Sequence, residues 1–290
     1  MRKSMLMIAL LLPAAALASK PVSLVQNEYD FAADTAKLGV HDGFLLYLDK
    51  QSVTFAPKPV NAYDYYAGQK PGSTVLKWYP AYALVAASGD YGVDTGPWVA
   101  EWSKDGKPQQ AYGEWLTIWS KDADGKWKAL YDGGIGHPKP DTPTKTLAHD
   151  SKVPQMPAVT AAVPAEDDVH DQLIRAETVF SNDAAKSLRS AYDGGGSDDI
   201  RLLLEDGQPM LGKELADKVV PAVSSGLVWV PLGGSAARSG DLGYIYGMTY
   251  KTADTAHVAP QGTYMHVWRK SVDGWKLIIA MESPLPADTK

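Results

Sequence analysis

The chain has no cysteine among its 290 residues. This absence excludes disulfide bonds, thiolate metal sites and a cysteine nucleophile. The 6 histidines are scattered without the short spacing that metal ligands need. The sequence also lacks a Gly-x-Ser-x-Gly elbow, a phosphate-binding loop and the Rossmann glycine pattern. We therefore predict neither a metal site nor a cofactor.

Clustered positive charge is missing as well. The net charge at pH 7 is −6, and the longest basic features are isolated pairs such as Arg269-Lys270. Nucleic acids and anionic membrane surfaces are both bound through clusters of Lys or Arg. The composition therefore argues against both as partners.

Long apolar runs are absent except at the N-terminus. Residues 1–18 carry Arg2 and Lys3, then an apolar stretch, then a small-residue motif that ends at Ala18. This order is typical of a cleaved signal peptide, and the stretch is shorter than the ~20 residues of a membrane span. A retained N-terminal anchor is the alternative, but no cysteine is present for a lipoprotein anchor. We predict a periplasmic or secreted protein without membrane insertion, whose net charge changes from −6 to about −8 when Arg2 and Lys3 are removed.

What the sequence does contain is an internal repeat with an offset of about 150 residues. The matching segments are 28–37 and 177–186, 78–80 and 229–231, 88–92 and 239–243, 113–119 and 262–268, and 124–128 and 273–276. A period of this length indicates two tandem globular domains. We place the first domain at 24–135 and the second at 167–286. The Pro-rich segment 136–166 between them is predicted to be a linker, which either separates the domains or lies in the groove between them.

Each half begins with helical periodicity and continues with strands. In the second half Val169, Leu173, Ala176 and Phe180 fall on one helical stripe. Strands of period two, separated by Gly/Asp turns, are predicted at 76–87, 91–102, 110–120 and 126–132, and at 226–236, 243–252, 262–270 and 275–281. Short strands near 52–56 and 200–204 and helices near 62–68 and 213–220 precede them. This order predicts an α+β fold of two tandem cone-shaped domains, each with N-terminal helices packed on a curved antiparallel sheet.

Three segments carry a resemblance to a known family. Trp78-x-Pro80, then 88–96, then 112–128 resemble the nuclear transport factor 2-like superfamily, specifically its secreted SnoaL-like members of unassigned function. The second half is similar through 229–231, 239–247 and 262–276. The resemblance implies a cone-shaped domain with a cavity between its helices and a bent sheet.

That superfamily contains ketosteroid isomerases, polyketide cyclases, dehydratases, small-molecule binders and protein-interaction modules, so the resemblance does not imply one function. Its isomerases use an acidic base and a Tyr/Asp pair that polarises a carbonyl. No segment of this sequence matches those motif positions. We therefore transfer no catalytic residue.

Aromatic rings with a polar atom are abundant, because the chain has 9 Trp and 15 Tyr but only 4 Phe. Pockets and interfaces use such rings for stacking combined with one directed hydrogen bond. The predicted ligand-binding residues are Trp78, Trp98, Trp115, Trp119, Trp229, Tyr246, Tyr264, His266 and Trp268. The alternative is that Trp119 and Trp268, which recur in both halves, are core residues.

Positions at which the two halves differ are the candidates for chemistry. The corresponding pairs are Thr117 and His266, Asp132 and Ala280, Gly134 and Glu282, and Asp94 and Ile245. Asp132 is a candidate base if burial raises its pKa, and a solvated strand end is the alternative. His266 and Glu282, on adjacent strands, form the second candidate pair, and an ordinary hydrogen-bonded histidine is the alternative.

These observations favour an exported small-molecule-binding protein with aromatic-lined pockets and no catalytic activity. One alternative is a lyase or isomerase that acts on a carbonyl compound in one domain only. Another is a structural or interaction module whose two copies dock as an intramolecular pseudo-dimer, or which forms a homo-oligomer.

Overall fold

The computed structural model describes residues 22–156, 166–213 and 226–287. Within these residues each half of the chain combines helices with one sheet, which confirms the predicted α+β class. The predicted signal peptide, 1–18, lies outside the described residues. So does nearly all of the predicted helix at 213–220.

The first half has its helices on one face of a seven-stranded sheet. Its helices are α1 (Leu24–Leu38), α2 (Val40–Tyr47) and α3 (Ala62–Gly68). Its strands are β1 (Leu48–Phe55), β2 (Pro59–Asn61), β3 (Val75–Trp78), β4 (Tyr82–Val85), β5 (Tyr91–Lys104), β6 (Lys107–Lys121) and β7 (Trp127–His137). The strand order is β2-β1-β7-β6-β5-β3, with β4 also paired to β5. The single strand predicted at 76–87 is in fact two strands, β3 and β4, with a break around Pro80. Proline has no backbone N–H to donate to a neighbouring strand, so it interrupts the pairing.

The second half repeats this arrangement in the residues that the structure describes. Its elements are α4 (Glu166–Ala184), α5 (Leu188–Gly195), β8 (Gly196–Leu204), β9 (Met210–Leu211), β10 (Leu227–Ala236), β11 (Leu242–Lys251), β12 (Pro260–Ser271) and β13 (Gly274–Pro284). The strand order, β10-β11-β12-β13-β8-β9, matches that of the first sheet read from its other end. In both sheets the strand after the first helices pairs in parallel with the last strand, so each sheet is mixed and not wholly antiparallel as predicted. Many residues separate the two strands of each parallel pair, and such a connection permits parallel pairing.

Helix α1 brings a carboxyl group into the core of the first half. Ser23 caps the helix by accepting a hydrogen bond from a backbone N–H, and the helix ends at Gly39, whose φ of 86° suits glycine. Leu24, Glu28 and Phe31 are spaced at i, i+4 and i+7, so they share one stripe, and all three are buried. The glutamate therefore faces the concave side of the sheet together with apolar neighbours.

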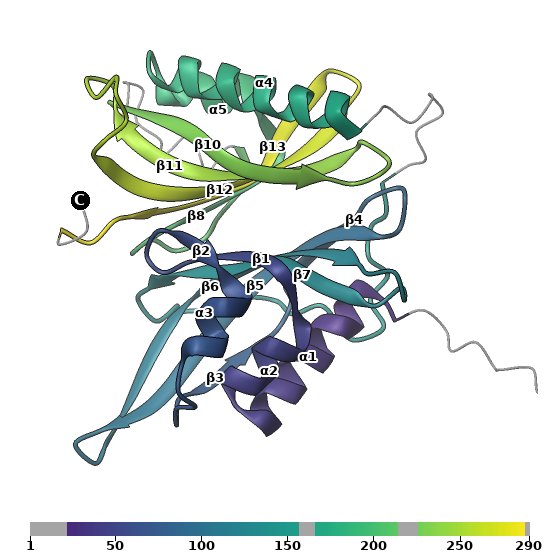
Figure 1. The fold of residues 1–290 in the computed structure, drawn as a ribbon, viewed down its shortest axis with the longest axis vertical. Coiled ribbons are helices and arrows are strands. Elements are labelled where there is room, and N and C mark those ends of the chain that lie inside the picture. Colours follow the sequence, from purple (N-terminus) through teal and green to yellow (C-terminus); the bar gives the residue numbers. More distant parts are fainter. Residues whose placement is uncertain (1–21, 157–165, 214–225, 288–290) are drawn as a thin grey trace, which may run out of the picture.

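The two sheets face each other in the middle of the molecule, and the helices lie on the outer faces (Figure 1). Side chains alternate between the two faces of a strand, so Leu116 and Ile118 of β6 both point into this contact. Met265 and Val267 of β12 do the same. These four residues belong to one buried apolar cluster that contains side chains from both halves. The intervening residues of both strands point the other way, toward the helices.

The repeated Ser-Gly-Asp turns, 88–90 and 239–241, meet at this contact. Their central glycines have φ of 72° and 68°, as a tight turn requires. The backbone N–H of Ala87 donates to Asp241 Oδ2 over 2.9 Å, and the hydroxyls of the two turn serines lie 3.1 Å apart. The turns therefore join the halves in addition to reversing the chain.

The described part of the predicted linker lies along the first half. The N–H of Leu147 donates to the carbonyl of Pro80 over 2.8 Å, and the ring of His149 stacks on Tyr29 with centroids 3.6 Å apart. Gln155 forms an isolated parallel β-bridge with Val85 of β4. Up to residue 156, therefore, the segment packs against the first half.

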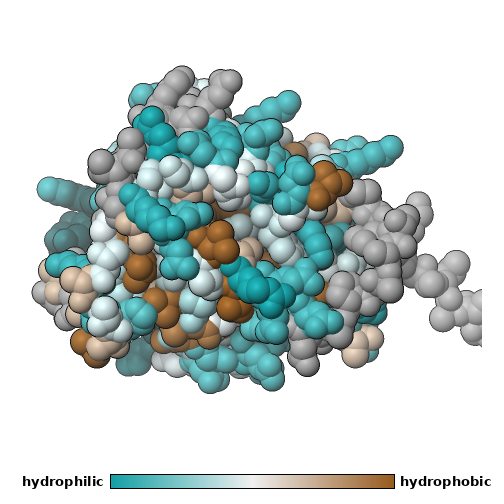
Figure 2. Space-filling model, turned by 90° about the horizontal axis from the view of Figure 1, so that it is seen from above, coloured by the Kyte–Doolittle hydropathy of each residue, from teal (hydrophilic) through white to brown (hydrophobic). Residues whose placement is uncertain are grey.

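The outer surface over the helices of the second half is mostly polar. Figure 2 views the molecule from this side and shows apolar residues as separate patches among polar ones. Scattered apolar residues are normal on soluble surfaces and do not by themselves indicate a contact site. Within the described ranges, no helix has the length and apolar character needed to cross a membrane.

Candidate functional site

A cavity of about 280 Å³ lies in the first half, between its helices and the concave face of its sheet. It is lined by Phe44, Tyr66, Leu76, Trp78, Trp98, Ala100, Trp115, Asp132, Gly133 and Gly134. This volume is near the lower end of the range for small-molecule sites, roughly 300–1,000 Å³. A predominantly apolar wall with one carboxyl group is typical of such a site.

Aromatic rings make up most of the cavity wall. Phe44 contacts Tyr66, with ring centroids 4.6 Å apart. Trp98 lies over Gly113, where an added Cβ would come within 2.4 Å of the indole. The indole N–H of Trp115 is buried and has no acceptor among the described residues. The wall is thus built largely of flat aromatic surfaces.

Asp132 of β7 is the charged residue of the lining. It is only 8% exposed, so the alternative of a solvated strand end is wrong. Its Oδ2 accepts a hydrogen bond of 2.8 Å from the Thr117 hydroxyl, and no bond is recorded to its other oxygen among the described residues. Burial raises the pKa of Asp132 to about 7, although the Thr117 hydrogen bond acts to lower it. The carboxyl group therefore changes charge near neutral pH.

Two further carboxyl groups are buried deeper in the first half and, with Asp132, form what we term the carboxyl cluster. Glu28 Oε1 accepts from the Trp78 indole over 2.5 Å, and Asp94 Oδ1 accepts from the Trp119 indole over 2.8 Å. The second oxygen of each has no donor from a described residue. Burial raises the pKa of both groups, which also interact with each other. A proton shared by Glu28 and Asp94 would satisfy both oxygens.

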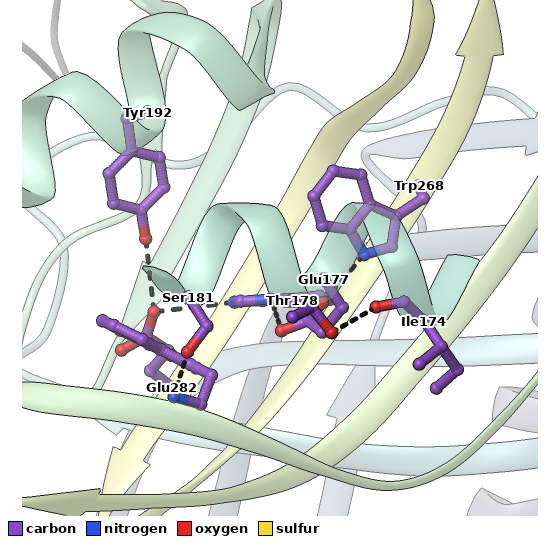
Figure 3. A network of polar contacts seen from close by, with 9 residues as sticks. Ile174, Glu177, Thr178, Ser181, Tyr192, Trp268 and Glu282 are labelled. Carbon is purple, nitrogen blue, oxygen red and sulfur yellow. Dashed lines mark hydrogen bonds and ion pairs between the residues drawn. The ribbon is translucent and has the colours of Figure 1, made fainter. Parts of the chain in front are cut away.

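The second half contains a buried network with its own basic group. His266 Nδ1 lies 3.0 Å from Glu177 Oε1, and its Nε2 lies 3.7 Å from Glu282 Oε1. The Trp268 indole donates to Glu177, and the Tyr192 hydroxyl donates to Glu282 (Figure 3). Burial lowers the pKa of His266, but the two glutamates outweigh it and raise the pKa to about 9. The imidazole is therefore protonated at neutral pH.

Strand register shows which positions correspond in the two sheets. Thr117 pairs with Asp132, His266 with Ala280, Trp115 with Gly134, and Tyr264 with Glu282. A glutamate side chain in the second half therefore stands where the first half has a cavity-lining glycine. Beside it Tyr264, the counterpart of Trp115, is fully buried.

The structure separates the predicted ligand-binding residues into three groups. Trp78, Trp98 and Trp115 line the cavity of the first half. Trp119, Trp229, Tyr264, His266 and Trp268 are buried in the two helix-covered cores and do not line it. Tyr246 packs against the cluster between the sheets. The recurring Trp119 and Trp268 are core residues, in agreement with the alternative given for them.

Sequence reasoning missed Glu28, although it recurs as Glu177. A carboxyl group repeated between apolar residues of a helical stripe is a signal of a buried polar site, and it was available in the sequence. Asp94 was noted only as a difference between the halves. Among the described residues, no group of His, Cys, Asp or Glu is arranged to hold a metal ion.

Several solved structures are similar to part of the chain. A CaMKII hub from S. rosetta has 20% identity over 40% of this chain and 98% of its own, with a TM-score of 0.32. The association domain of CaMKII from C. elegans has 12% identity, covering 37% and 88%, with a TM-score of 0.30. A ketosteroid isomerase-like protein from Erwinia carotovora atroseptica has 20% identity, covering 41% and 94%, with a TM-score of 0.30. No protein-family model and no curated protein matches the chain. Likenesses of this degree define no function.

Proposed function

We propose that this is an exported protein of the nuclear transport factor 2-like kind, whose first half binds a small, partly apolar molecule without converting it. The observation that carries the proposal is the aromatic cavity with Asp132 in its wall. Ligand sites typically combine apolar walls with a few polar groups that fix orientation. The second oxygen of Asp132, to which no hydrogen bond from a described residue is recorded, supplies such a group. The N-terminal sequence pattern supports export.

The second half is, in this proposal, a permanent partner for the first. The shared apolar cluster between the sheets and the contact between turns 88–90 and 239–241 support an intramolecular pseudo-dimer. Its own core contains the buried network of His266 and Glu177. Ligand binding is then a property of one half, and the other half supports its sheet.

Binding is tested by thermal shift and tryptophan fluorescence with a panel of small aromatic and alicyclic compounds. Ala100 lines the cavity, so Ala100→Leu reduces its volume and is expected to abolish the response. Ala123 lies in an exposed turn and is not part of the lining, so Ala123→Leu is the control. A ligand response that survives Ala100→Leu would place binding elsewhere.

A second candidate function is a lyase or isomerase that acts on a carbonyl compound in the first half. It is favoured by the pKa of Asp132 near 7, which suits a general base at neutral pH. His266 and Glu282 do not line the cavity and have no part in this candidate.

The catalytic candidate is tested by exchange of carbonyl α-protons in deuterated water, followed by NMR over a panel of cyclic ketones. Exchange that requires the wild-type protein and is lost in Asp132→Asn would support catalysis. Exchange at equal rates in both proteins, or none in either, would leave binding as the function of the cavity.

A further inference from the structure

The carboxyl cluster of the first half has no basic partner. None of the cavity-lining residues is Lys, Arg or His. Within the described parts of the chain, no ion pair involves Glu28, Asp94 or Asp132. Glu28 and Asp94 can share a proton, but Asp132 has one oxygen to spare and lies in the cavity wall. An ionised carboxylate in this setting is costly unless a cation comes to it.

In the second half, a histidine of the chain itself provides positive charge beside the buried carboxyl groups. His266 occupies the register position of Thr117 and contacts Glu177, the counterpart of Glu28. There the positive charge is part of the chain. In the first half Thr117 supplies only a hydroxyl, and the cavity is open. The first half therefore lacks a built-in cation, and its cavity lies beside Asp132.

The aromatic wall adds an independent preference for positive charge. Phe44, Tyr66, Trp78, Trp98 and Trp115 surround the cavity. The faces of aromatic rings attract cations, and cages of several rings are a recognised way to bind organic ammonium groups. Carboxylates such as Asp132 would repel an anionic ligand from the same space.

We propose that the first-half cavity binds an organic cation, an amine or quaternary ammonium group carried on a small apolar body. The ammonium group lies against the free oxygen of Asp132, and the aromatic rings contact the apolar part. This assignment rests on the proposed small-molecule binding and names the class of ligand.

Binding of such a cation is coupled to ionisation of Asp132. The titratable groups around Asp132 are Glu28 from α1, Tyr66 from α3, Asp94 from β5 and its own neighbour Tyr131 in β7, with the Thr117 hydroxyl from β6. All are acidic or neutral, so none supplies a competing positive charge. Affinity for a permanent cation therefore increases as the pH rises through about 7.

The test uses three phenyl-bearing probes with the full chain: benzyltrimethylammonium, its neutral isostere neopentylbenzene, and the smaller anion benzoate. Affinities are measured by calorimetry and by tryptophan fluorescence at about pH 5 and about pH 8. We expect the cation to bind roughly tenfold more tightly than the isostere at the higher pH, with most of this preference lost at the lower pH. Because the charge of benzyltrimethylammonium does not change with pH, the pH dependence reports on the protein.

Two variants locate the effect. Asp132→Asn keeps the shape of the side chain and is expected to abolish the preference for the cation, while binding of the neutral isostere persists. Asp124→Asn makes the same change in charge at an exposed turn and is expected to behave as wild type. If Asp132→Asn does not fold, the wild-type protein tests the assignment by itself, because its preference for the cation over the neutral isostere must be smaller at the lower pH than at the higher pH.

The outcomes separate the two proposals. Equal affinity for the cation and its isostere at the higher pH, or tighter binding of benzoate, overturns the cation assignment and leaves small-molecule binding in place. A cation preference that Asp124→Asn removes as fully as Asp132→Asn overturns the assignment to the cavity. Failure of all three probes to bind at either pH overturns the cation assignment, and the wider compound panel then decides whether the cavity binds anything.

Discussion

Thr117 in β6 and His266 in β12 occupy the same register position in the two sheets, opposite Asp132 and Ala280 respectively. The Thr117 hydroxyl donates to Asp132 over 2.8 Å, whereas the His266 ring contacts Glu177 over 3.0 Å. Both halves bury carboxyl groups between helix and sheet. The second half neutralises them with an imidazolium, and the first half retains protons and an open cavity.

Asp132→Asn is expected to flatten the pH dependence of stability. Burial raises the pKa of Asp132 from 3.8 to about 7, so the folded state binds more protons than the unfolded state between these values. The free energy of unfolding therefore falls as the pH rises through this window. The variant lacks this loss and should be more stable than wild type at about pH 8, by about 1–3 kcal/mol. Urea denaturation at several pH values measures the difference, and parallel curves for the two proteins would contradict it.

His266→Gln is expected to destabilise the second half at neutral pH. It removes the cation between Glu177 and Glu282 and leaves two partly or fully buried carboxyl groups, a loss of about 3–5 kcal/mol. The pKa of His266 is raised from 6.5 to about 9, so its stabilisation is complete below 6.5 and is lost as the pH rises through about 9.

The cost of His266→Gln should therefore be smaller at about pH 10 than at pH 7. Denaturant unfolding at both values measures it. His170 lies on the exposed side of α4, and His170→Gln serves as the matched control with little expected change. The same cost at both pH values would show that His266 acts through its shape and not its charge.

Asp241→Ala is expected to weaken the contact between the two halves. Asp241 Oδ2 accepts from the Ala87 N–H over 2.9 Å, and Oδ1 accepts from the Ser239 hydroxyl over 2.6 Å. Removing a buried acceptor of two hydrogen bonds costs about 1–3 kcal/mol. Thermal unfolding measures the loss, and limited proteolysis detects looser packing of the halves. Asp273→Ala, in an exposed Asp-Gly turn, should change stability by no more than about 0.5 kcal/mol.

Gly113→Ala is expected to disturb the cavity wall. A Cβ at this position would meet the Ile135 carbonyl oxygen at 1.9 Å and the Trp98 ring at 2.4 Å, so backbone and indole must both move. We expect a loss of about 1–3 kcal/mol and weaker ligand binding. Gly72 has no atom within 4 Å of an added Cβ, and Gly72→Ala is the control. Wild-type binding by Gly113→Ala would mean that Trp98 does not contribute to the site.

The strands were largely predictable because their signals are local. The segments predicted at 91–102 and 275–281 are β5 (Tyr91–Lys104) and β13 (Gly274–Pro284). The strand predicted at 126–132 instead continues as β7 to His137. Gly133 and Gly134 suggested a break, but both lie within the strand. Glycine is needed at 133 because an added Cβ would lie 2.4 Å from the Tyr131 hydroxyl.

The candidate site was predictable only in part. Trp78, Trp98 and Trp115 were singled out as rings with a polar atom, and they line the cavity. Glu28 was missed because a helical stripe is normally recognised by its apolar members, and a carboxyl group in it is assigned to solvent. Its burial depends on contacts with Trp78, which lies 50 residues further along the chain.

The sequence by itself determined the order of helices and strands, the α+β class and the recurrence of the same signatures in both halves, since periodicity and turn residues act over a few positions. Tertiary structure decided which sheet face is covered by helices and which faces the other half. It also decided that the first half has a cavity beside Asp132 and that the second half buries His266 against Glu177. Cavities, desolvation and raised pKa values arise from packing between residues distant in the chain, so no local pattern encodes them.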